Sequence, residues 1–180
     1  MDEQAMRGKK AAGMRGRTRS IAFVGLTIAL MFALLALTPR ECLAAIAGYL
    51  ALGAVGLPMF SGMRGGIGML LGPTGGYLWG YMLAAAAALA VRAALRRALG
   101  GGASGGRLAG RRAWAVDLAA CLVFIVVTYT CGCVQYAAVV GVDLAAAFAV
   151  TIAPFAIPDL VKAVAAVACA RAVTRAVGRR

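Results

Sequence analysis

The stretch that decides the fold is residues 21–39, which read IAFVGLTIALMFALLALTP. These 19 residues carry no charge. At 1.5 Å per residue, a helix of this length covers roughly the 30 Å hydrocarbon core of a bilayer. No convincing small-residue cleavage site separates the run from a soluble domain, so we interpret it as a retained helix and not as a secretory signal. The stretch therefore predicts a membrane helix.

The composition of the 180 residues also indicates a membrane protein. Hydrophobic residues make up 63% and charged residues 14%, against about 45–50% and about 25% in a soluble globular domain. The mean hydropathy is +0.87. A small soluble protein could not bury so much apolar surface. We therefore predict an all-α, polytopic membrane helix bundle in a lipid bilayer.

The basic residues flank the apolar stretches. Lys and Arg number 19 and Asp and Glu 6, and most of the basic residues lie before Ser20, between Arg92 and Arg112, or from Arg171 onward. Cytoplasmic loops of membrane proteins carry such an excess. We therefore expect a multi-pass plasma-membrane protein with a cytoplasmic C-terminus. The same distribution argues against nucleic-acid binding.

The apolar runs predict five spans in one membrane domain, residues 21–177, between a basic cytoplasmic tail, 1–20, and a basic end, 178–180. We expect Arg40 and Glu41 to form a polar turn, and residues 135–143 to form a connector followed by a short apolar piece. The spans are expected at Ile21–Thr38, Leu43–Leu57, Pro73–Val91, Trp114–Val134 and Pro158–Val177.

The charge clusters and the spans conflict in one respect. Three spans separate the basic tail from the Arg92–Arg112 loop, and an odd number places the two on opposite sides of the membrane. Either one span is re-entrant, or one cluster is not cytoplasmic, or the chain lacks a helix that its architecture needs.

Tracing the chain back from the Arg92–Arg112 loop places three polar patches on the outer half of the bundle. One of them is Asp159 with Lys162, three residues apart and hence on one helical face. A charge at membrane depth normally faces a cavity or a partner. The alternative is a structural ion pair near the interface, and we favour a ligand site because a glycine-rich segment lies on the same side.

The second patch lies near Arg64 at the end of the second span, and the third is Gly72–Tyr77 at the start of the third span; a glycine-rich segment contains both. This segment lacks the P-loop pattern, but glycines allow a backbone to approach a ligand closely. Helix N-termini near Thr74 and Asp159 would favour an anion, so a carboxylate ligand is expected. Tyr77, directly after the glycines, is a further candidate contact. The candidate backbone contacts are Gly65, Gly66, Gly72, Thr74, Gly75 and Gly76.

Other kinds of site have little support in the sequence. There is no His, and the five Cys residues include no C-x-x-C pair, so neither a metal site nor a disulfide framework is expected. No nucleophile–base pair is visible. We therefore predict no catalytic residues, no enzyme activity and no cofactor.

Two strings resemble the BioY family, the biotin-binding S components of energy-coupling-factor (ECF) vitamin transporters. They are GLPMFSGMRGGIGMLLGPTGGYL, residues 56–78, and PFAIPDLVKA, residues 154–163, with Pro158 where the family usually has Gly. The resemblance implies a six-helix bundle that binds biotin from outside and works with a transmembrane T component and ABC-type ATPases. It also implies that Asp159 and Lys162 bind the ligand, that Arg64 occupies a polar contact position, and that Tyr77 shapes the cavity.

The chain departs from this family before residue 39. Relatives carry two helices there, joined by an outer loop with a Pro-Phe-Thr-Leu-Gln-like string that this chain lacks. Residues 20–31 look like the start of the first helix joined to the end of the second, residues 32–38. This implies that roughly 20 residues and a loop are missing. The function is therefore expected to be biotin uptake or, alternatively, a structural or interaction role of a degenerate relative that binds no vitamin.

Overall fold

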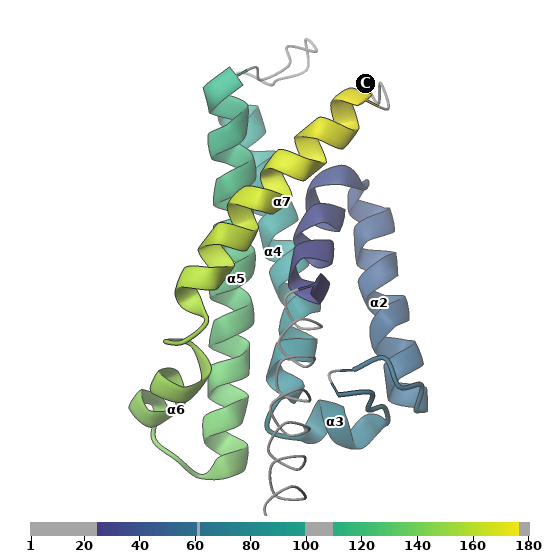
Figure 1. Ribbon diagram of the computed structural model, residues 1–180, viewed down its shortest axis with the longest axis vertical. Helices are drawn as coiled ribbons and strands as arrows, with labels where there is room; N and C mark the ends of the chain where they lie inside the picture. Colours follow the sequence, from purple (N-terminus) through teal and green to yellow (C-terminus); the bar gives the residue numbers. More distant parts are fainter. Residues whose placement is uncertain (1–24, 61, 100–109, 177–180) are drawn as a thin grey trace, which may run out of the picture.

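The computed structural model describes residues 25–60, 62–99 and 110–176, so the predicted tail 1–20 and the end 178–180 lie outside the described residues. The described part is a bundle of helices (Figure 1). Its β-structure is limited to one isolated bridge between Phe60 and Arg64. The predicted all-α class is confirmed. The helices are Gly25–Ala36, α2 Pro39–Val55, α3 Ile67–Leu71, α4 Gly75–Ala98, α5 Gly110–Val140, α6 Leu144–Thr151 and α7 Ala156–Ala176.

Different segments of the chain lie at the two ends of the bundle (Figure 1). At one end lie the junction between Ala36 and Pro39, the end of α4, the start of α5 and the end of α7; we call it the basic end. At the other, the loop end, lie residues 56–74, which include α3, and residues 141–155, which include α6. The end of α2 and the starts of α4 and α7 therefore lie toward the same end of the bundle, as the sequence predicted.

Two described helices, α4 and α5, are each long and apolar enough to cross a membrane. The pair α6 and α7 passes the same test together, with a bend of 53° at the break between them, and makes a third span if it is one broken helix. The helix Gly25–Ala36 is apolar but shorter. Length and composition thus support two or three of the five predicted spans.

Two predicted connections are helical instead. The polar turn predicted at Arg40 and Glu41 is wrong, because Pro39 opens α2 and Glu41 closes a capping box with Thr38. The Glu41 carboxylate accepts from the Thr38 N–H at 2.9 Å. The connector predicted at residues 135–143 is also wrong for most of its length, since α5 continues to Val140. The helix continues because residues 135–140 contain no Gly or Pro to end it.

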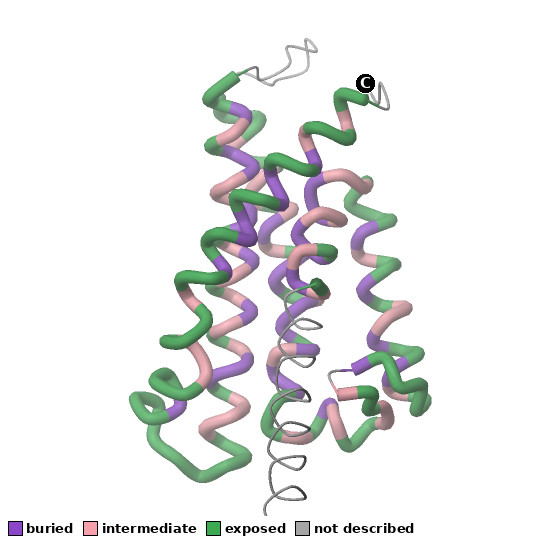
Figure 2. The backbone as a smooth tube through the Cα atoms, viewed as in Figure 1, coloured by how far each residue is buried: buried purple, intermediate pink, exposed green. Residues whose placement is uncertain are grey.

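Buried residues line the inner faces of the helices, while the outer faces are exposed (Figure 2). The centre of α4 is lined by small side chains, among them Ala84, Ala85 and Ala88, which are fully buried. Small residues let membrane helices approach closely. Large apolar side chains such as Leu83 and Val126 are more than half exposed, as expected for surfaces that face lipid.

Candidate functional site

The glycine-rich segment at the loop end is held by α2 on one side and by α5 on the other. The Gly66 N–H donates to the Gly53 carbonyl at 2.7 Å. On the α5 side, the Gln135 amide donates to the carbonyls of Leu70 at 3.0 Å and Gly72 at 2.9 Å. These bonds fix the turn between α3 and α4, and they use a residue that the sequence analysis had placed in a connector.

Several of the candidate glycines have close backbone neighbours. A Cβ at Gly65 would meet the Leu57 carbonyl, one at Gly75 the Leu70 carbonyl, and one at Gly76 the Cys131 carbonyl. Gly66 has open space around it but a φ of +99°, which disfavours other residues. Because Gly65, Gly75 and Gly76 have no side chain, neighbouring backbones can pack closely at the loop end. The same feature would let a ligand approach the backbone.

The Asp159–Lys162 pair lies inside the bundle and not toward lipid. Asp159 is 7% exposed and Lys162 8%. The Lys162 ammonium donates to Asp159 Oδ1 at 2.5 Å, and the Tyr129 hydroxyl of α5 donates to Asp159 Oδ2, also at 2.5 Å. The carboxylate at the start of α7 is thus held from its own helix and from α5.

Tyr77 joins this group from α4. Its ring lies edge-on to the ring of Tyr129, with centroids 6.3 Å apart. The ring passes so close to Gly132 that a Cβ there would collide with it. The Tyr77 hydroxyl donates to the Thr151 carbonyl at the end of α6 at 3.4 Å. Tyr77 therefore connects α4, α5 and α6 beside the Asp159–Lys162 ion pair.

The other predicted contacts lie on the outer part of the loop end. Thr74 and Arg64 are both exposed. Arg64 is held through its backbone, which pairs with Phe60, with N···O distances of 2.9 Å and 3.4 Å. Within the described residues, no hydrogen bond or ion pair joins the Arg64 side chain to Asp159 or Lys162. The structure thus brings Tyr77, Asp159 and Lys162 together through Tyr129, which donates to Asp159 and contacts the Tyr77 ring. Arg64 lies outside this group.

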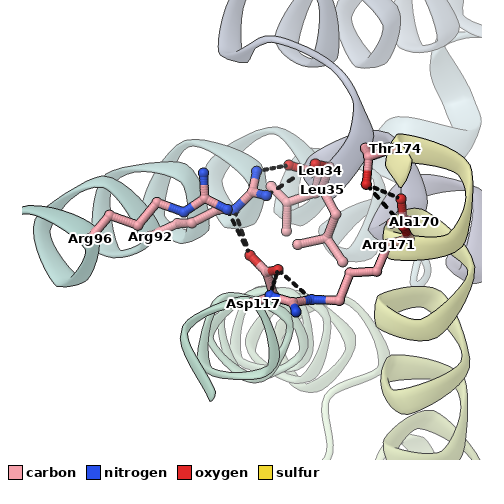
Figure 3. Close-up of polar contacts among 8 residues, drawn as sticks. All are labelled: Leu34, Leu35, Arg92, Arg96, Asp117, Ala170, Arg171 and Thr174. Carbon is pink, nitrogen blue, oxygen red and sulfur yellow. Dashed lines mark hydrogen bonds and ion pairs between the residues drawn. The ribbon is translucent and has the colours of Figure 1, made fainter. Parts of the chain in front are cut away.

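A second group of charges surrounds Asp117 at the basic end (Figure 3). Asp117 Oδ1 accepts from Arg92 Nε at 3.0 Å and from Arg96 Nη2 at 3.1 Å. Its Oδ2 accepts from Arg171 Nε at 3.1 Å and Nη2 at 3.0 Å. Arg92 also donates to the carbonyls of Leu34 and Leu35, each at 3.0 Å. This arginine cluster links the helix Gly25–Ala36, α4, α5 and α7.

Three residues that make such contacts, Tyr129, Gln135 and Asp117, were not predicted from the sequence. A signal for Asp117 was present, because it is the one charged residue in the Trp114–Val134 run, and a charge inside a span normally has a partner. Tyr129 lies between Thr128 and Thr130, a polar triplet inside the same run. In the part of the chain that the structure describes, no group of three or more Cys, Asp or Glu residues could hold a metal ion.

Comparisons with known proteins agree on one family. The model of the BioY family matches residues 15–179. A probable biotin transporter BioY of Pyrococcus horikoshii is 35% identical over 151 residues, covering 82% of this chain and 79% of that protein. The biotin transporter BioY2 of Lactococcus lactis is 46% identical over 52 residues, 29% of each chain.

A solved structure has the same fold. The crystal structure of the S-component for biotin from an ECF-type ABC transporter matches with a TM-score of 0.66 at 21% identity, covering 83% of this chain and 73% of that one. The resemblance found in the two sequence strings is thereby confirmed. With a family match over most of its length and apolar helices that can cross a membrane, this multi-pass membrane protein belongs to the BioY family.

Proposed function

We propose that this chain is a biotin-binding S component that mediates biotin uptake across the plasma membrane. Membership in the BioY family and the names of the relatives support this function. A transmembrane T component and ABC-type ATPases would supply the energy. The observation that carries the proposal is the Asp159–Lys162 pair, which is buried near the start of α7 against Tyr129 of α5 instead of facing lipid.

The pair has unused hydrogen-bonding capacity. A carboxylate can accept about four hydrogen bonds, and Asp159 accepts two from side chains, from Lys162 and Tyr129. An ammonium has three donors, and Lys162 uses one on Asp159. Biotin offers ureido N–H donors, a carbonyl acceptor and a carboxylate. In this proposal Asp159 accepts hydrogen bonds from the ureido N–H groups. A cation, Lys162 or Arg64, binds the carboxylate.

The remaining candidate residues form the mouth of the site in this proposal. Tyr77 forms a wall beside the Asp159–Lys162 ion pair, and its contact with Tyr129 supports that placement. Arg64 is exposed, which would let it meet an incoming carboxylate. The candidate backbone contacts are Gly65, Gly66, Gly72, Thr74, Gly75 and Gly76, at the loop end.

The orientation we propose puts the basic end, with the C-terminus, in the cytoplasm and the loop end outside. The described residues of the basic end carry eight basic and two acidic side chains, whereas the loop end carries two of each. An excess of Lys and Arg marks the cytoplasmic side. The basic residues are Arg40, Arg92, Arg96, Arg97, Arg111, Arg112, Arg171 and Arg175, and the acidic ones Glu41 and Asp117.

The test is binding of radiolabelled biotin to the purified full chain. Asp159→Asn and Lys162→Ala should each weaken binding about 10-fold or more, because each removes charge-assisted hydrogen bonds worth about 1.5–3 kcal/mol. Asp143→Asn is the matched control: Asp143 caps α6, Asn caps equally well, and binding should not change. No saturable binding by the unaltered chain would favour the degenerate relative. Unchanged binding in both variants would overturn the site.

A further inference from the structure

The arginine cluster at the basic end contains more positive charge than its single acid can balance. Arg92, Arg96 and Arg171 surround Asp117. Within the described residues no second acidic side chain contacts the three guanidinium groups. We infer that this cluster binds the phosphate of an anionic phospholipid headgroup in the leaflet at the basic end.

Two of the three arginines have further partners within the protein. Arg92 donates to the carbonyls of Leu34 and Leu35, at the negative end of a helix dipole. Arg171 lies over the ring of Trp114, 5.7 Å from its centroid, in a cation–π contact. These two guanidinium groups are also largely buried, with side-chain exposures of 13% and 17%. Neither is the natural contact for a molecule arriving from the membrane.

Arg96 is the member of the cluster that can reach an external anion. Its side chain is 46% exposed, and it gives one N–H to Asp117. Its other donors make no hydrogen bond within the described part of the chain. A guanidinium presents several N–H groups in one plane, a geometry that matches a phosphate. Arg97, the next residue, is exposed as well and adds a second positive charge at the same level of α4.

The surface of α4 below these arginines favours a lipid over a soluble ligand. Its exposed residues recur at intervals of three and four, the spacing of one helical face. The stripe they form, Trp79, Leu83, Ala86, Ala90 and Ala93, is apolar and leads to Arg97. Acyl chains can lie along this stripe while the headgroup meets the guanidinium groups at its end. Basic pockets between membrane helices bind anionic headgroups in this way.

The inference can be tested by lipid binding to the full chain in detergent micelles, with phosphatidylglycerol and phosphatidylcholine titrated separately and bound lipid counted by native mass spectrometry. We expect phosphatidylglycerol to bind about 10-fold more tightly than phosphatidylcholine. Arg96→Gln should remove most of this preference, because it loses a charged hydrogen-bond donor. Arg96→Lys, which keeps the charge but loses the planar fork, should give an intermediate value.

The matched control is Arg40→Gln, which removes one positive charge from an exposed site at the same end of the bundle, on α2. It should change the affinity for phosphatidylglycerol by less than about twofold, since Arg40 lies on another helix and, within the described residues, takes no part in the contacts of the arginine cluster. Equal affinities for the two lipids, or equal effects of Arg96→Gln and Arg40→Gln, would overturn the inference. Displacement of phosphatidylglycerol by millimolar inorganic phosphate would show that the site binds free phosphate, and would overturn the inference that its ligand is a lipid.

Discussion

Asp117→Asn is the substitution that most directly tests the arginine cluster as a structural element. The change keeps the size of the side chain and removes its negative charge. Asp117 accepts four hydrogen bonds through two oxygens, and Asn offers one oxygen and an amide that points N–H groups at cations. Three guanidinium groups would then share the site without a counter-charge.

The size of the effect follows from how deeply each partner is buried. Removing one member of a buried charge pair costs about 3–5 kcal/mol. Arg92 and Arg171 are largely buried, but Arg96 is 46% exposed, stays hydrated and contributes little. The lower end of the range, about 3 kcal/mol, is therefore expected. For a chain of this length it corresponds to a fall in Tm of about 6–12 °C.

The assay is thermal unfolding of the purified chain in detergent, read by exposure of buried cysteines to a thiol-reactive dye; Cys42 and Cys121 are fully buried. Asp143→Asn makes the same chemical change at an exposed helix cap and should shift Tm by no more than about 2 °C. If the two variants unfold at the same temperature, the cluster does not hold the basic end together. A double variant with Arg171→Gln should lose less than the sum of the single losses, because the partners are coupled.

Three further outcomes are expected. Tyr129→Phe should weaken biotin binding about 10-fold, since the hydroxyl that orients Asp159 is lost, whereas unchanged affinity in an equilibrium binding assay would remove Tyr129 from the site. Gly132→Ala should destabilise the chain by about 1–3 kcal/mol in the thermal assay, because its Cβ meets the Tyr77 ring, while Gly48→Ala, with open space around it, should be neutral or stabilising. Membrane-impermeant labelling of single cysteines at positions 8 and 107 should find them on opposite faces if the chain lacks one helix of the family's architecture; labelling on the same face would contradict this.

Much of the loop end could be predicted because it depends on residues close together in the sequence. Asp159 and Lys162 share a helical face whatever the rest of the bundle does, since three residues make nearly one turn. The placement of helix ends at one side follows from alternating spans. Glycines in the string 56–78 mark the place where backbones pass closely, as the neighbours of Gly75 and Gly76 show.

Contacts between helices were not predictable in the same way. The contact of Tyr129 with Asp159 depends on how α5 and α7 are rotated about their axes, and both helices present apolar residues on nearly every side. In a soluble helix a polar face would fix that rotation, but lipid accepts apolar side chains on all outer faces. The same reason explains why Asp117 could be recognised as unusual but not assigned to Arg92, Arg96 and Arg171.

The two buried acids, Asp117 and Asp159, differ in how many hydrogen bonds they accept from the protein. Asp117 accepts four hydrogen bonds, about the full capacity of a carboxylate, and its partners are permanent cations on two other helices. Asp159 accepts two from side chains, from Tyr129 and from Lys162 on its own helix. A carboxylate whose oxygens already accept their full number of hydrogen bonds from the protein cannot accept more from a ligand. A carboxylate that accepts only about half of that number can. We therefore expect an acid that stabilises the bundle to use its full acceptor capacity and an acid that binds a ligand to keep part of it unused, and under the proposed function Asp159 is the acid that binds biotin.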